Sequence, residues 1–195
     1  MKKIPTLFER VFDRHRIVDV LPNVYPGMKW VFDGEGTATE KIDGSCCCVM
    51  NGILYKRYDA KNGKIPPPGA IPCDDPDPIT GHWPHWLVVD PLDNGDRWFC
   101  EAWNNTFEQL GRIPEDGTYE AVGRHFNSNP YDMNTDILVK HGAEIIDERY
   151  LHRSFEGIKK YLEEHELEGI VFWKDGEPQC KIKRTDFGLK WPIEK

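Results

Sequence analysis

The sequence predicts an α+β fold built mainly from antiparallel strands. Two hairpin turns are signalled, Asn51-Gly52 and Asp175-Gly176, each between runs of strand-forming residues. One helix is well marked, because Ser154 offers an N-cap hydroxyl just before an apolar stripe with helical spacing. Strand and helix patterns do not alternate along the chain, so a doubly wound parallel sheet is not expected.

The N-terminal third predicts several short elements. Residues 1–20 mix apolar and basic side chains and predict a short helix followed by a strand. A short strand is expected over residues 30–32, before a glycine-containing turn. Three further strands are predicted over residues 37–41, 46–50 and 53–58, and the last two form the hairpin at Asn51-Gly52.

Residues 61–84 are rich in proline and aspartate, which excludes a central strand or a helix interior. We expect a long surface loop, anchored by Trp83 and Trp86. Loops of this length are often functional, and whether this one is a lid is left open. His82 and His85 are three residues apart, but a proline lies between them and no further ligand is near, so a metal site there is not favoured.

The second half of the chain predicts short elements of both kinds. Helical segments are expected over residues 105–110 and 136–141, before the helix that starts at Ser154. Strands are expected over residues 97–103, 118–123, 143–147, 169–174 and 179–184.

Length and composition place the chain among globular proteins. Its 195 residues fit a single domain over 1–195, with no separate C-terminal domain. No apolar run is long enough to cross a bilayer, and the N-terminal residues lack the apolar core of a secretory signal. The net charge of −8 argues against a general nucleic-acid coat protein but leaves room for a local basic groove, for which Arg124, Arg184 and Lys190 are candidates.

The six cysteines do not have metal-site or redox spacing. Cys46, Cys47 and Cys48 are adjacent, and side chains alternate along a strand, so the three cannot face one partner. We interpret the cysteines as free thiols of a protein from the cytoplasm or another reducing intracellular compartment.

The tetrapeptide Lys41-Ile42-Asp43-Gly44 is the most informative stretch. A lysine between a strand and a glycine turn is held at the edge of a sheet, where neighbouring cations can favour its neutral, nucleophilic form. Taken alone, the tetrapeptide favours a surface Lys-Asp pair beside a turn glycine over a reactive lysine.

Other charges also lie inside predicted strands, and they suggest a nucleotide site. Lysines and an arginine can bind phosphates, and glutamates can hold a divalent cation or a ribose. The residues are Lys41, Asp43, Arg57, Glu120, Glu168, Lys181 and Lys183.

These residues fall in segments that resemble, in order, the motifs of the covalent nucleotidyltransferases, which include DNA ligases, RNA ligases and capping enzymes. Residues 40–45 resemble motif I (Lys-x-Asp-Gly), and Arg57 with Lys61 keeps an Arg-x-x-x-Lys spacing. Segments 118–123, 168–171 and 181–183 resemble motifs III, IV and V. A narrower similarity, to the 5′-to-3′ RNA ligase family of vertebrates and some large viruses, is carried by residues 81–86, 126–131, 141–143 and 188–192.

The resemblance implies two antiparallel sheets with flanking helices around a nucleotide cleft. It implies Lys41 as the nucleophile that carries AMP, and Glu168 and Glu120 as ligands of Mg²⁺, with Mn²⁺ as an alternative ion. Val171 would pack on adenine, whereas the aromatic residue expected on the other adenine face is replaced by Ile145 or Ile146. The implied ATP-binding residues are Glu40, Ile42, Asp43, Gly44, Arg57, Lys61, Glu120, Val171, Lys181 and Lys183.

The implied function is an ATP-dependent RNA ligase that joins a 5′-phosphate to a 3′-hydroxyl through lysyl-AMP and AMP-RNA intermediates. Its partners would be RNA ends and not a membrane, and a monomer is favoured. The alternatives are an ATP-dependent DNA ligase, a GTP-using capping enzyme, and a non-catalytic protein that binds RNA ends or adenine nucleotides.

Overall fold

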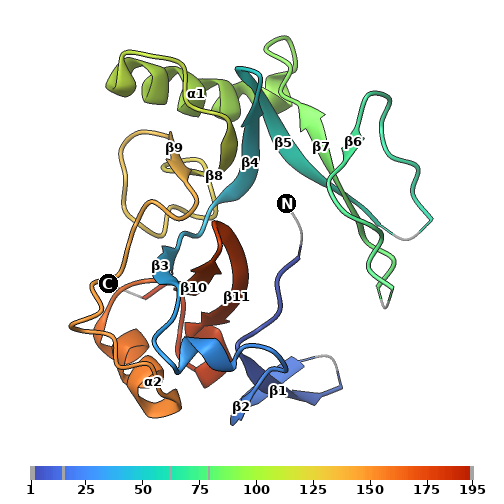
Figure 1. The fold of residues 1–195 in the computed structure, drawn as a ribbon. Helices are drawn as coiled ribbons and strands as arrows, with labels where there is room; N and C mark the ends of the chain where they lie inside the picture. The colour runs from blue at the N-terminus through green and yellow to red at the C-terminus, as the bar shows by residue number, and fades with distance from the viewer. Residues whose placement is uncertain (1–2, 15, 62, 79, 194–195) are drawn as a thin grey trace. The chain divides into compact units, whose positions relative to one another are not determined.

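The computed structural model describes residues 3–14, 16–61, 63–78 and 80–193. The predicted α+β class is confirmed, since the named strands pair antiparallel and helices are few. The strands are β1 (Phe8–Asp13), β2 (Arg16–Val24), β3 (Thr37–Lys41), β4 (Ser45–Met50), β5 (Ile53–Ala60), β6 (Ile71–Pro72), β7 (Trp83–Val88), β8 (Gly117–Val122), β9 (Ile137–Lys140), β10 (Gly169–Lys174) and β11 (Glu177–Lys183). The helices are α1 (Arg97–Leu110) and α2 (Phe155–Glu164), with 3-10 turns η1 (Lys29–Val31), η2 (Asn94–Asp96) and η3 (Arg184–Phe187) (Figure 1).

The chain divides into two compact units. The first comprises Asp43–His141 together with Lys3, and the second comprises Ile4–Ile42 and the described residues from Gly142 onward. The chain passes from one unit to the other within the tetrapeptide 41–44, so Lys41 belongs to the second unit and Asp43 to the first.

The first unit is built on a six-stranded sheet with the order β6-β7-β5-β4-β8-β9. One face packs with α1, where Cys47, Tyr119 and Ala102 lie in a common apolar core (Figure 1). Because side chains alternate along β4 and β8, Cys46 and Glu120 lie on the other face. The six cysteines are free thiols, and the adjacent three are divided between the two faces as expected.

The second unit holds the three-stranded sheet β11-β10-β3 and the β1-β2 hairpin. One face of the three-stranded sheet is fully buried against residues of α2 such as Ile158 and Leu162. Its side chains are Ala38, Ile170, Phe172, Cys180 and Ile182, each with no exposed surface. By alternation, the residues between them, including Lys41, Lys181 and Lys183, lie on the opposite face.

Residues 97–103 form the first half of α1 and not the predicted strand. The aromatic cluster around Trp98 and Phe99 suggested alternation, but the helical period is also present. Phe99, Ala102 and Thr106 are spaced three and four apart, and Ala102 and Thr106 are buried. A longer window would have favoured the helix, because alternation over a few residues is a weak signal.

Other short predictions also differ from the structure. Strands β1 and β2 form a hairpin, and the described residues before it, 3–7, contain no helix; residues 29–31 form η1 where a strand was expected. The expected helical turn over 136–141 contains β9, which completes the six-stranded sheet. The expected strand over 143–147 is reduced to a single bridge between Ile145 and Thr39. The secondary structure of these segments depends on pairing and packing with residues distant in the sequence, which the local sequence pattern does not reveal.

The described residues of the proline-rich segment 61–84 form a loop that includes β6, which pairs with β7, and β7 itself begins inside the segment at Trp83. Its anchoring by tryptophans is confirmed, since Trp83 donates from Nε1 to the carbonyl of Asp74 at 2.9 Å and Trp86 is buried. His85 is 1% exposed and its Nδ1 lies 2.9 Å from the carbonyl oxygen of Trp83. Within the described part of the chain, no helix is both long and apolar enough to cross a membrane.

Candidate active site

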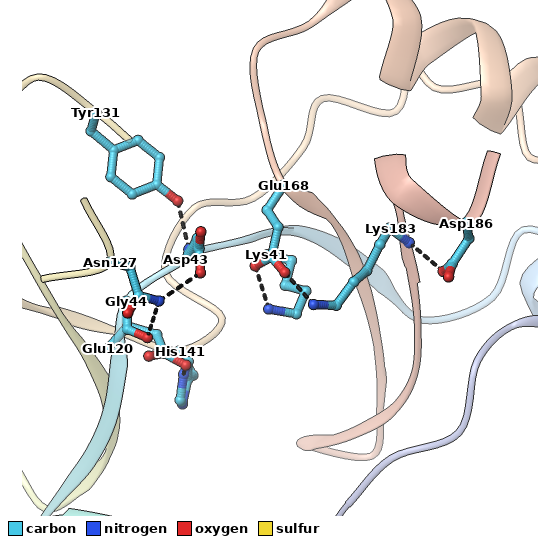
Figure 2. A network of polar contacts seen from close by, with 10 residues as sticks. All are labelled: Lys41, Asp43, Gly44, Glu120, Asn127, Tyr131, His141, Glu168, Lys183 and Asp186. Carbon is cyan, nitrogen blue, oxygen red and sulfur yellow. Dashed lines mark hydrogen bonds and ion pairs between the residues drawn. The ribbon is translucent and has the colours of Figure 1, made fainter. Parts of the chain in front are cut away.

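The second unit brings two predicted lysines onto one predicted glutamate. Nζ of Lys41 lies 2.5 Å from Oε2 of Glu168, and Nζ of Lys183 binds Oε1 of the same carboxylate (Figure 2). The Glu168 side chain is 5% exposed, whereas those of Lys41 and Lys183 are 18% and 31% exposed. A buried carboxylate is tolerated there because each of its oxygens meets an ammonium group.

The register of the three-stranded sheet explains this convergence. Gly169 at the start of β10 is paired with Lys41 of β3 on one side and with Lys183 of β11 on the other. Both lysines therefore flank the same point, directly beside Glu168. A Cβ atom at Gly169 would lie 2.2 Å from the carbonyl oxygen of Ile182, so only glycine permits this close approach of β10 and β11.

Lys181 adds a third ammonium group to this lysine-bearing face. Burial, and after it the nearby charges of Lys41, Lys183 and Arg10, lower the pKa of the Lys181 ammonium from 10.5 to about 8, with Glu168 opposing them. The three lysines of this face outnumber Glu168, the carboxylate that Lys41 and Lys183 bind, and Arg10 is paired with Asp186. The face has an excess of positive charge, which suits a polyphosphate anion.

We predict that Lys181→Met stabilises the fold at pH 7. Because the folded-state pKa is depressed, protonated Lys181 destabilises the native state below about pH 8, and this cost disappears as pH rises from about 8 to 10.5. The variant should gain roughly 1–3 kcal/mol in the free energy of unfolding. Chemical denaturation of both proteins at pH 7 and at pH 10 would check this. A gain that is absent at pH 7, or that does not shrink at pH 10, contradicts the account.

The remaining predicted residues of the second unit differ in placement. Val171 lies on the lysine-bearing face, paired with Thr39 and Lys181. Glu40 points to the opposite face, where burial and the charge of Glu144 raise the pKa of its carboxyl. Ile42 follows β3 and is partly buried.

Two apolar side chains lie near Val171: Ile145, which the sequence analysis named beside the adenine, and Trp173, which it did not. Ile145 is 68% exposed and is bridged to Thr39, directly beside the lysine-bearing strand. Trp173 shares the face of Val171 and donates from Nε1 to Oγ1 of Thr39 at 2.8 Å. Trp173 lies two residues after Val171 in the predicted strand, a spacing that could have revealed it.

In the first unit, Asp43 and Gly44 are bound by a polar loop. Asn127 donates from Nδ2 to Oδ1 of Asp43 at 2.9 Å and to the carbonyl of Gly44 at 2.8 Å, and Oη of Tyr131 accepts from the Asp43 amide at 2.6 Å (Figure 2). A Cβ atom at Gly44 would lie 2.4 Å from the carbonyl oxygen of Ala121, so this position also needs glycine. Asn127 and Tyr131 were not among the predicted site residues, although their segment was noted for its resemblance.

Glu120 has a partner that the sequence did not suggest. Its Oε1 lies 3.1 Å from Nε2 of His141 (Figure 2). Nδ1 of His141 lies 2.8 Å from Oγ1 of Thr118. The other oxygen, Oε2, is buried and has no hydrogen-bond partner among the described residues. Cys46 is the cross-strand partner of Glu120, and burial, together with the Glu120 charge, raises the pKa of its thiol to about 12.

Two further predicted cationic residues are Arg57, which lies in β5, and Lys61, which follows it. Arg57 donates from Nε to Oδ1 of Asp59 at 2.9 Å, and its side chain is 25% exposed. Lys61 follows β5 and is exposed. The predicted site residues are therefore divided between the units: Lys41, Glu168, Lys181, Lys183 and Val171 belong to the second, and Asp43, Gly44, Arg57 and Glu120 to the first.

One suggested RNA-binding residue is excluded. Arg184 is 6% exposed, and its guanidinium donates to the carbonyls of Leu162, His165 and Lys190. These bonds tie the end of α2 to the C-terminal segment, so the guanidinium is not available for a phosphate. Its position after a run of alternating lysines gave no sign of this burial.

Comparison with known proteins agrees with the motif resemblance. No protein-family model matches the chain. Proteins named RNA ligase 1 are similar to it: that of Pongo abelii is 26% identical, that of Danio rerio 25% and that of Mus musculus 24%, in each case over 80% of this chain and 68% of the relative. The chain is thus related to proteins named RNA ligase 1, and this relationship is consistent with an RNA ligase-related nucleotidyltransferase family.

Proposed function

We propose that the chain is an ATP-dependent RNA ligase in which Lys41 is the nucleophile. The observation that carries the proposal is the pairing of Lys41 and Lys183 with Glu168, on a sheet face that Lys181 makes strongly cationic. Relatives named RNA ligase 1 support the reaction class. A single reactive lysine among phosphate-binding cations is the arrangement that nucleotidyl transfer to a lysine requires.

In the first step, Nζ of Lys41 attacks the α-phosphorus of ATP. An N–P bond forms, the bond from the α-phosphorus to the bridging oxygen breaks, and pyrophosphate leaves. Lys181 and Lys183 share the face of Lys41 and would neutralise charge on the phosphates. Alignment and charge neutralisation contribute most of the rate in such a transfer.

The attack requires a neutral amine, so Lys41 must lose a proton. Oε2 of Glu168, at 2.5 Å from Nζ, supports this carboxylate as the proton acceptor or as the group that orients the amine. Glu168 also offers the carboxylate oxygens that Mg²⁺ or Mn²⁺ prefers as ligands. Both oxygens are paired with lysines, so the ammonium group of Lys41 or Lys183 would have to move away before an ion could bind. Such an ion would supply further charge neutralisation at the phosphates.

The nucleoside would be bound by the remaining residues. Val171 would pack on one face of adenine, and Ile145, exposed beside Thr39, is our candidate for the other face. Glu120 would accept from the ribose hydroxyls. Asp43 and Gly44 would keep the loop after Lys41 in place, and Arg57 and Lys61 would contribute phosphate contacts.

In the later steps, the AMP passes from Lys41 to an RNA 5′-phosphate, and a 3′-hydroxyl then displaces AMP. The first transfer breaks the N–P bond and forms a P–O–P linkage. The second forms the phosphodiester and releases AMP. Both reuse the same phosphate-binding lysines, because the reacting phosphorus is again next to an adenylate.

The test uses ATP labelled at the α-phosphate. We expect a covalently labelled protein on a denaturing gel, chase of the label to 5′-phosphorylated RNA, and a sealed RNA product. Competition with unlabelled GTP should not reduce labelling, which separates a ligase from a capping enzyme. Sealing of DNA in preference to RNA would indicate a DNA ligase. Absence of any covalent label would contradict the catalytic proposal and favour the alternative of a non-catalytic protein that binds RNA ends or adenine nucleotides.

A further inference from the structure

Beyond ligation, we propose that Cys46, Glu120 and His141 form a binding site for a thiolate-preferring divalent cation of the Zn²⁺ class. Their candidate ligand atoms, one from each side chain, all lie within 4.8 Å of one another. All three belong to the first unit, and the proposal does not depend on ligase activity.

The sheet itself places the three ligands. Cys46 of β4 is directly opposite Glu120 of β8. The His141 amide donates to the carbonyl of Thr118, so His141 stands opposite Thr118, two residues from Glu120 and on the same face. Strands β4 and β8 and the residue that follows β9 hold the ligands, and this backbone arrangement exists without the ion.

The unmet bonding capacity of Glu120 points to a missing ligand. Glu120 is 9% exposed, and its buried Oε2 has no hydrogen-bond partner among the described residues. A buried carboxylate oxygen without a partner destabilises the folded protein unless something binds it. A cation bound between Glu120, Cys46 and His141 would remove this cost.

The donor set selects the kind of ion. Thiolate and imidazole favour Zn²⁺ and related ions over Mg²⁺, and three protein ligands leave a fourth position open. Oγ1 of Thr118, at 2.8 Å from Nδ1 of His141, can accept from Nδ1–H and so leave the Nε2 lone pair for a metal. Binding would displace the thiol proton of Cys46 to solvent, with no change of oxidation state.

A second cluster has similar candidate ligand atoms, from Glu101, His125 and Asp136. It differs because the buried carboxylate of Asp136 has hydrogen-bond partners for both of its oxygens. Both oxygens of Asp136 already accept from His125, one from its amide at 3.0 Å and one from Nδ1 at 2.6 Å. The ring of His125 is also stacked on Trp98 at 3.4 Å. This cluster therefore serves as an internal control.

The experiment titrates the full chain with Co²⁺, without ATP. We expect one equivalent to bind, with a thiolate-to-metal charge-transfer band and the visible bands of low-coordinate Co²⁺, and Zn²⁺ should displace it. Cys46→Ser should abolish the charge-transfer band, and Cys46→Ser, Glu120→Gln and His141→Ala should each weaken binding at least about tenfold.

The controls are Cys100→Ser, a partly exposed thiol on α1, and His125→Ala in the second cluster, and both should bind as the parent does. Circular dichroism verifies that each variant is folded, and Cys46→Ser changes only one atom. Absence of Co²⁺ binding, a charge-transfer band that survives Cys46→Ser, or equal loss in Cys100→Ser would each overturn the proposal.

Discussion

Lys41→Arg is expected to abolish covalent labelling by ATP while leaving the fold intact. Arginine can still pair with Glu168, so the buried carboxylate keeps a cationic partner. A guanidinium stays protonated at neutral pH and is not a nucleophile, so no N–P bond can form. Labelling with α-phosphate-labelled ATP should fall at least about a thousandfold, which corresponds to about 4 kcal/mol in the activation barrier. Thermal unfolding should change little.

Lys174→Arg is the matched control for this prediction. Lys174 lies at the end of β10 and is paired with Glu35 at 2.5 Å, away from Glu168, and its side chain is 35% exposed. The same substitution there should leave labelling unchanged. Lys183→Met should retain weak labelling, because it removes a phosphate contact but not the nucleophile. If Lys41→Arg is labelled as well as the parent, another residue carries AMP and our proposal is wrong.

Gly169→Ala is expected to cause the largest loss of stability. The added Cβ would stand 2.2 Å from the carbonyl oxygen of Ile182 and 2.9 Å from Cα of Lys183, both backbone atoms of the paired strand. Since β11 cannot move away without breaking its pairing with β10, the free energy of unfolding should fall by about 3 kcal/mol or more. Denaturant unfolding measures the loss directly.

The same displacement should reduce labelling even in the folded fraction, because Gly169 is the register partner of both Lys41 and Lys183. Gly95→Ala is a suitable control, since its Cβ would meet only side-chain atoms of Asp93, the nearest at 3.2 Å. We expect the control to unfold within about 0.5 kcal/mol of the parent. Equal stability of Gly169→Ala and the parent would show that the strands adjust more freely than the register implies.

Elements with a strong local signal were predicted correctly from the sequence. The hairpin of β4 and β5 was marked by Asn51-Gly52, and that of β10 and β11 by Asp175-Gly176. Helix α2 begins after Ser154, whose hydroxyl accepts from the Gly157 amide at 3.0 Å as an N-cap. In each case a few neighbouring residues determine the backbone conformation.

Elements that depend on distant partners were predicted less well. Strand β9 is held by its pairing with β8, and β1 by its pairing with β2, and neither has a distinctive turn signal of its own. The first half of α1 carries aromatic residues that locally resemble a strand. Its conformation is fixed by packing against the six-stranded sheet, which short-range patterns do not describe.

The sequence by itself determined the lysine tetrapeptide at 41–44, the charged residues of the later strands, and the resemblance that links them to nucleotidyl transfer. These are properties of residue type and spacing. Only the tertiary structure decided that Lys41 and Lys183 share Glu168, that Glu40 faces away, and that His141 joins Glu120 and Cys46. Strand register sets all three, because one residue of displacement moves a side chain to the other face of a sheet.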